Sequence, residues 1–129
     1  MSADAILTLN NIEVIYDRVA LAIKGASIAV PQGGMVALLG ANGAGKSTLL
    51  KAVSGLLKAE RGEVTRGELH FLGENIDVLP PQTRVQRGIV QVLEGRRVFE
   101  HLTPDENLLA ASAVRGTGGA ELQRDRDRV

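Results

Sequence analysis

One eight-residue segment constrains the fold of this chain more than any other. Residues 40–47 read GANGAGKS and match the pattern G-x-x-x-x-G-K-[ST]. The unbroken apolar run 35–39 before the segment has the length of a buried strand, and the residues from Thr48 onward have a helical pattern. A strand, a glycine-rich loop and a helix in this order are typical of a phosphate-binding loop in an α/β fold.

The residue types in this segment suit a bound triphosphate. Glycines let the backbone bend closely around the phosphates, so that backbone N–H groups and the positive end of the following helix face the negative charge. Lys46 would add a point charge at the β- and γ-phosphates, and the Ser47 hydroxyl would complete the Mg²⁺ shell. The alternative is that the glycines form only a flexible turn. The predicted phosphate-site residues are Gly40, Ala41, Asn42, Gly43, Ala44, Gly45, Lys46, Ser47 and Thr48.

Composition places the 129-residue chain among globular proteins of one domain or less, because 44% of its residues are hydrophobic and 23% are charged. Fifteen basic residues balance fifteen acidic ones. The net charge of zero therefore offers no electrostatic case for a nucleic-acid partner or an anionic membrane surface. The absence of cysteine excludes disulfides and cysteine-ligated metal.

The first ten residues carry Asp4 where a signal peptide would carry basic residues, and no long apolar segment follows. No apolar run approaches the ~20 residues that span a bilayer. We therefore expect neither a signal peptide nor a membrane span, so that any membrane association depends on a partner.

Apolar periodicity and turn residues predict the remaining elements. Asn10 and Asn11 break the first alternating strand, Gly55 weakens the end of the helix after the loop, and Gly88 stops the next helix. Thr103 with Glu106 forms a capping box at the start of another helix. The expected strands are 6–16, 20–30, 35–39, 67–73 and 89–92, and the expected helices are 48–58, 80–87 and 104–113.

These motifs together resemble the ATP-binding subunits of ABC transporters. The resemblance covers nearly the whole chain and includes the tyrosine strand, the phosphate loop, a polar loop at Glu94 and the TPDENL helix start. The stretch VLEGRRVFEHLTPDENL is most similar to subunits of branched-chain amino-acid uptake systems. The resemblance implies an α/β fold with a P-loop NTPase core and an antiparallel β subdomain, incomplete in this chain.

The resemblance also implies roles for single residues. Tyr16 would stack on adenine; the alternative is that it merely fills the edge of the small sheet. Glu94 stands where the family has its Q-loop glutamine, near Mg²⁺ and the attacking water. Leu93 replaces the usual proline, and an alternative register would make Gln91 the active glutamine. The resemblance thus implies catalytic roles for Lys46 and Glu94 and Mg²⁺ contacts from Ser47 and Glu94, with ATP and Mg²⁺ as cofactors.

The family resemblance further implies partners and a location. The region from Glu94 to Phe99, including Arg96 and Arg97, would meet transmembrane permease subunits, unless these are ordinary solvated charges and a core aromatic. A second ATP-binding subunit would complete the assembly at the cytoplasmic face of the membrane. His70 and His101 come too early to be the family's switch histidine, so we expect a sheet residue and an exposed residue.

Several family motifs are missing from these 129 residues: the LSGGQ signature, the Walker B aspartate, the catalytic glutamate and the switch histidine. Residues 1–129 are therefore expected to be the N-terminal part of one nucleotide-binding domain, able to bind ATP without turning it over and poorly soluble alone. Two other interpretations are a non-catalytic nucleotide-binding or assembly module and a different phosphate-loop enzyme, such as a small-molecule kinase.

Overall fold

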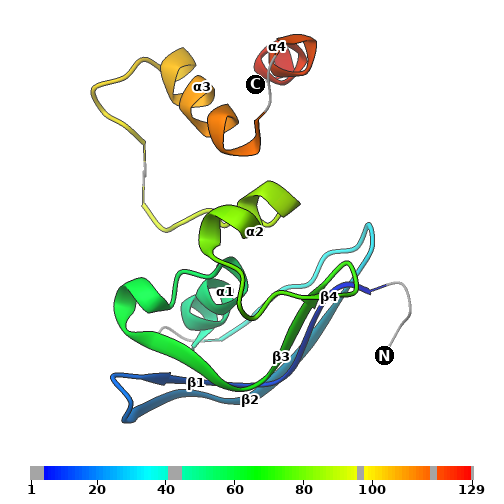
Figure 1. The fold of residues 1–129 in the computed structure, drawn as a ribbon, viewed down its shortest axis with the longest axis vertical. Coiled ribbons are helices and arrows are strands. Elements are labelled where there is room, and N and C mark those ends of the chain that lie inside the picture. The colour runs from blue at the N-terminus through cyan, green and yellow to red at the C-terminus, as the bar shows by residue number, and fades with distance from the viewer. Residues whose placement is uncertain (1–4, 41–44, 96–97, 117–118, 129) are drawn as a thin grey trace.

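The computed structural model describes residues 5–40, 45–95, 98–116 and 119–128. Its strands form one antiparallel sheet with the order β2-β1-β3-β4. Helix α1 lies over one face of this sheet, α2 lies beyond α1, and α3 and α4 lie farthest from the sheet (Figure 1). The elements are β1 Ala5–Tyr16, β2 Ala20–Pro31, α1 Lys46–Ser54, the 3₁₀ turn η1 Lys58–Glu60, β3 Gly62–Phe71, β4 Glu74–Asn75, α2 Pro81–Arg87, α3 Pro104–Arg115 and α4 Gly119–Arg128.

The first two predicted strands are confirmed as the β1–β2 hairpin, which pairs Tyr16 with Ala20 at its closed end. Asn10 and Asn11 do not end β1. The register shifts there instead, against both neighbouring strands, and Asn11 takes a left-handed conformation with φ of 49°. The expected break is therefore a β-bulge inside a continuous strand.

Strand β3 is longer than predicted because Gly67 lies within it and does not begin it. Gly67 has φ of 89°, and a Cβ there would lie 2.3 Å from the carbonyl oxygen of Asn10. The glycine thus lets β3 pass the bulge of β1 at close range. Gly67, which we expected to begin the strand, therefore serves strand pairing inside it.

Helix α1 is shorter than predicted and ends at Ser54 instead of extending to residue 58. Gly55 adopts a left-handed conformation with φ of 84°, and its N–H donates to the carbonyl of Lys51. This is an αL helix cap, which stops the helix outright. Leu57 consequently packs into the core from the segment after the helix.

The predicted strands at residues 35–39 and 89–92 are absent from the sheet. A strand needs a neighbour to supply hydrogen-bond partners, and no described residue pairs with either run in a ladder. Met35 and Val92 are accordingly 94% and 92% exposed. The two runs therefore have the apolar sequence of buried strands but no neighbouring strand among the described residues.

The hydrophobic core lies between the sheet and α1. Leu9, Ile12, Val14 and Leu69 face it from the sheet, and Leu49 lies opposite them on α1. The helical stripe expected after the phosphate loop therefore packs back on the sheet, which orients the start of α1 relative to β1.

The two later helices begin as predicted. Helix α2 starts behind Pro80 and ends at Gly88, which has φ of 112°. Thr103 and Glu106 form the complete capping box of α3, which extends to Arg115. No helix among the described residues has both the length and the apolar composition needed to cross a bilayer.

Candidate functional site

The N-terminus of helix α1 lies at the end of the glycine-rich loop. Gly45 precedes it in a left-handed conformation with φ of 93°, and no side chain caps this terminus. The first hydrogen bond of the helix runs from the N–H of Leu49 to the carbonyl of Gly45. The N–H groups of the first turn therefore have no intrahelical acceptors and favour an anion, and no acidic residue lies in that turn to oppose one.

Lys46 closes the glycine-rich loop across its two ends. Its Nζ donates a hydrogen bond to the carbonyl oxygen of Gly40, and this contact is exposed. One of three ammonium donors is used in this way. The predicted phosphate contacts from Ala41, Asn42, Gly43 and Ala44 lie outside the described residues.

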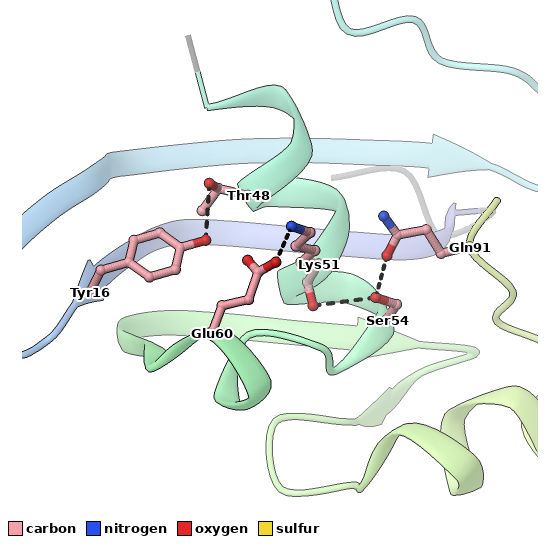
Figure 2. Close-up of polar contacts among 6 residues, drawn as sticks. All are labelled: Tyr16, Thr48, Lys51, Ser54, Glu60 and Gln91. Atoms are coloured by element: carbon pink, nitrogen blue, oxygen red, sulfur yellow. Dashed lines mark hydrogen bonds and ion pairs between the residues drawn. The ribbon is translucent and has the colours of Figure 1, made fainter. Parts of the chain in front are cut away.

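Tyr16 and the phosphate-loop helix meet although they are 32 residues apart in the sequence. The phenol oxygen of Tyr16 and the Thr48 Oγ1 are 3.2 Å apart (Figure 2). The ring is half-buried against the core cluster, so Tyr16 does fill the edge of the sheet. The same side chain nevertheless reaches the first turn of α1, where the expected nucleotide site begins.

Two further contacts hold α1 along its length (Figure 2). Lys51 pairs with Glu60 of η1 at 2.6 Å. At the last turn, the Ser54 hydroxyl donates a 2.5 Å hydrogen bond to Oε1 of Gln91. Since Ser54 is seven residues, or about 10 Å, along the helix from Ser47, Gln91 contacts the end of α1 remote from the phosphate loop. The Gln91 side chain is therefore engaged at the far end of α1 in this structure.

Arg84 joins α2 to the same end of α1. Its guanidinium donates to the carbonyls of Ala52 at 2.8 Å, Val53 at 3.0 Å, Leu79 at 2.9 Å and Asp77 at 3.3 Å, and the residue is only 5% exposed. Burial lowers the pKa of Arg84 below its usual value, and the Asp77 carboxylate opposes this shift. The guanidinium thereby satisfies carbonyls that the end of α1 leaves without intrahelical partners.

Glu94 lies exposed in a bend three residues after Gln91, followed by Gly95 with φ of 84°. Arg96 and Arg97 lie outside the described residues. Phe99 is 63% exposed, so it is not a core aromatic. It borders a hollow of about 400 Å³ with Val98, Leu102 and Leu108.

Asn107 organises the segment around this hollow. Its side chain accepts a hydrogen bond from the Phe99 N–H and donates to the carbonyls of Phe99, Leu102 and Thr103. The asparagine in the TPDENL segment thus holds the residues just before α3 in one conformation. The two histidines are where the sequence predicted: His70 lies in β3 and His101 is exposed.

The start of α1 fits a phosphate with a hard cation. N–H donors without intrahelical acceptors, the Lys46 ammonium and the Ser47 hydroxyl are groups that can bind phosphate and Mg²⁺. The described residues contain no group of three acidic, histidine or cysteine side chains that could hold a metal by themselves. A magnesium ion at Ser47 would therefore need phosphate oxygens and water as further ligands.

Sequence reasoning missed the contacts that hold the site together. Arg84 and Arg87 look alike in the sequence, yet Arg84 is buried while Arg87 pairs with Glu74 at the surface. Ser54 carried no signal beyond its place before Gly55. Nothing in the sequence indicated that a Cβ at Gly62 would lie 2.7 Å from the ring of Tyr16.

Comparison with known proteins agrees with this geometry. A family model described as ABC transporter matches residues 23–129. The chain is 35% identical over 120 residues to the high-affinity branched-chain amino acid transport ATP-binding protein BraG of Pseudomonas aeruginosa, covering 93% of this chain and 49% of that protein. It is 35% identical over 111 residues to the lipopolysaccharide export system ATP-binding protein LptB of Haemophilus influenzae, covering 86% and 44%.

A solved structure of an ATP-binding subunit of an ABC transporter superposes with a TM-score of 0.75 at 30% identity, covering 92% of this chain and 46% of that one. The chain belongs to the ABC transporter family. Its fold is that of the family's ATP-binding cassette, with the antiparallel sheet in place and the domain incomplete. The chain spans about half the length of the curated relatives it matches.

Proposed function

We propose that this chain binds ATP with Mg²⁺ at the start of α1. The observation that carries the proposal is the N-terminus of α1, which no described side chain caps and where the Lys46 ammonium contacts Gly40 across the loop. In this arrangement Lys46 contacts the β- and γ-phosphates, the N–H groups of residues 43–48 surround them, and Ser47 ligates Mg²⁺. Electrostatics and helix geometry at this end both favour a polyphosphate.

Tyr16 is proposed to receive the adenine ring. Its contact with Thr48 places an aromatic side chain beside the first turn of α1, so one nucleotide could reach both the loop and the ring. Stacking there would contribute about 1 kcal/mol. Glu94 is proposed to act near Mg²⁺ and the attacking water, since it stands at the position of the family's Q-loop glutamine.

Residues 1–129 are proposed to form the N-terminal part of one nucleotide-binding domain. The chain's share of its relatives' length supports this, as do the two apolar runs that have no ladder partner among the described residues. In this proposal, strands from the rest of the domain pair with these runs. Hydrolysis then belongs to the whole domain, because the signature, Walker B and catalytic glutamate are outside this sequence.

The whole protein is proposed to power import of branched-chain amino acids at the cytoplasmic face of the membrane, with permease subunits and a second ATP-binding subunit. The similarity to BraG and the VLEGRRVFEHLTPDENL segment support this substrate. The name of LptB, in contrast, refers to lipopolysaccharide export, so the similarity to that protein does not support this substrate. Exposed Phe99 and its hollow offer the surface for the permease.

Isothermal titration of the 129-residue chain with ATP, with and without Mg²⁺, tests the binding site. Ser47→Ala removes the proposed metal ligand, so it should abolish most of the gain in affinity that Mg²⁺ confers while metal-free ATP binds as before. A Mg²⁺ effect of equal size in the variant would contradict the role of Ser47. Leucine uptake by cells with and without the gene tests the proposed substrate. Equal uptake by both would contradict branched-chain amino acids as the substrate.

A non-catalytic nucleotide-binding module is the second candidate, since the groups at the start of α1 account for binding a phosphate and not for cleaving one. Phosphate release by the full-length gene product separates it from an ATPase. A small-molecule kinase is disfavoured by the family match over residues 23–129.

A further inference from the structure

Gly62 lies beside one edge of the aromatic ring of Tyr16, at the start of β3 and paired with Tyr16 across the β1–β3 ladder. A Cβ at position 62 would lie 2.7 Å from Cε1 and 3.1 Å from Cδ1 of that ring, and 3.2 Å from Cδ2 of Leu57. The two ring atoms form one edge of the ring. Any side chain at this position would therefore push that edge away.

The backbone of Gly62 does not itself require glycine. Gly45, Gly55 and Gly67 have positive φ angles, whereas Gly62 does not. Gly62 is also buried. Conformational freedom thus does not explain the glycine, whereas the space taken by its neighbours does, and the closest of these is the Tyr16 ring.

The opposite end of the same side chain is held by the phosphate-loop helix. The phenol oxygen of Tyr16 lies 3.2 Å from Thr48 Oγ1, two residues after Lys46 (Figure 2). The ring is thus fixed at its edge by Gly62 and at its hydroxyl by Thr48. A ring displaced from Gly62 would lose its position relative to Thr48, since both contacts depend on the same two side-chain torsions.

We propose that Gly62 is a positioning residue for recognition of the nucleotide base: by leaving room for the Tyr16 ring, it keeps that ring beside the phosphate loop at the place where the base stacks. The inference rests on the proposed binding of ATP at Lys46. It separates the site into a phosphate part, which Gly62 does not serve, and a base part, which needs the glycine through Tyr16.

Titration with two probes distinguishes these parts: Mg-ATP, which carries a base, and magnesium tripolyphosphate, which does not. Gly62→Ala should weaken Mg-ATP by about fivefold to tenfold, as much as Tyr16→Ala does, and leave tripolyphosphate affinity unchanged. The matched control is Glu63→Ala, the exposed neighbour on the same strand, which should bind both probes like the wild type.

The double variant Tyr16→Ala/Gly62→Ala guards against simple misfolding, because it removes the ring that the new methyl group would strike. If Gly62 acts through Tyr16, the double variant binds Mg-ATP as the Tyr16→Ala variant does. An additive loss, an equal loss for both probes or an unchanged Mg-ATP affinity in Gly62→Ala would each overturn the inference.

A ligand-free measurement keeps this inference distinct from the proposed function. Tyr16 is the sole tyrosine and the chain has no tryptophan, so tyrosine emission reports on this ring alone. Gly62→Ala should change that emission, whereas Glu63→Ala should not. Identical emission in Gly62→Ala would contradict the ring placement, whereas failure of the wild type to bind either probe would contradict the proposed function.

Discussion

The hydroxyl of Ser54, in the last turn of α1, donates a 2.5 Å hydrogen bond to Oε1 of Gln91, three residues before Glu94. Ser54 is nearly buried, at 6% exposure. The hydrogen bond attaches the segment that carries Glu94 to the helix that begins at the phosphate loop.

Removing either partner should cost about 1 kcal/mol of unfolding free energy, because the remaining polar group loses its hydrogen bond. Urea denaturation of Ser54→Ala, Gln91→Ala and the double variant measures the coupling between them. We expect the two losses to be strongly non-additive, since both remove the same bond. Additive losses would show that the bond does not contribute.

Arg84 should be far more sensitive to substitution than its neighbour Arg87. In Arg84→Lys a compact ammonium replaces a planar guanidinium that reaches four carbonyls, so some buried acceptors lose their donors. We expect a loss of about 2–3 kcal/mol in urea denaturation. Arg87→Lys is the matched control, since Arg87 pairs with Glu74 at the surface, and it should lose less than about 1 kcal/mol. Equal losses would contradict the role assigned to Arg84.

The capping box of α3 should stabilise the start of that helix. Thr103→Ala removes the acceptor for the Glu106 N–H, which lies 3.1 Å from the Thr103 hydroxyl oxygen, and should cost about 1 kcal/mol. Glu106→Gln should be nearly neutral, because the glutamine carbonyl can still accept from the Thr103 N–H. Thermal denaturation followed by circular dichroism compares the two variants. An unchanged melting temperature in Thr103→Ala would contradict the stabilising role of this cap.

Asn107 should protect the Phe99 amide from hydrogen exchange, since that N–H donates to the asparagine Oδ1 at 2.9 Å. Asn107→Ala should speed exchange at Phe99 as the acceptor is lost. Asn107→Asp keeps an acceptor while losing the donors, so it should retain protection at Phe99. Fast exchange at this amide in the native chain would contradict the described hydrogen bond.

Local signals in the sequence predicted much of the fold. Alternation identified β1 and β2, Gly88 ended α2, and Thr103 with Glu106 started α3, because each signal acts within a few residues. The predictions of strands at 35–39 and 89–92 were wrong for the described structure, because strand formation depends on partners that are distant in the sequence. The prediction from Gly55 was only partly right, because this glycine ends α1 and does not merely weaken its last turn.

The candidate site divides in the same way. The glycine-rich loop could be predicted because its chemistry lies in consecutive residues, and α1 starts within it at Lys46. The contacts of Tyr16 with Thr48 and Gly62, and of Ser54 with Gln91, join residues more than 30 positions apart. No spacing rule in the sequence predicts such pairs, since they depend on how α1 packs on the sheet.

The most direct test of the central claim is the dissociation constant of Mg-ATP, measured by isothermal titration for the wild type, Lys46→Ala and Lys51→Ala. Both lysines lie on α1, but Lys46 reaches Gly40 across the loop whereas Lys51 pairs with Glu60. Loss of a charge-assisted phosphate contact of about 1.5–3 kcal/mol predicts weakening of roughly tenfold to over a hundredfold for Lys46→Ala. Lys51→Ala should bind within about twofold of the wild type, because a partly exposed ion pair remote from the phosphates contributes little. An unchanged dissociation constant in Lys46→Ala, or equal weakening in both variants, would contradict a nucleotide site at the start of α1.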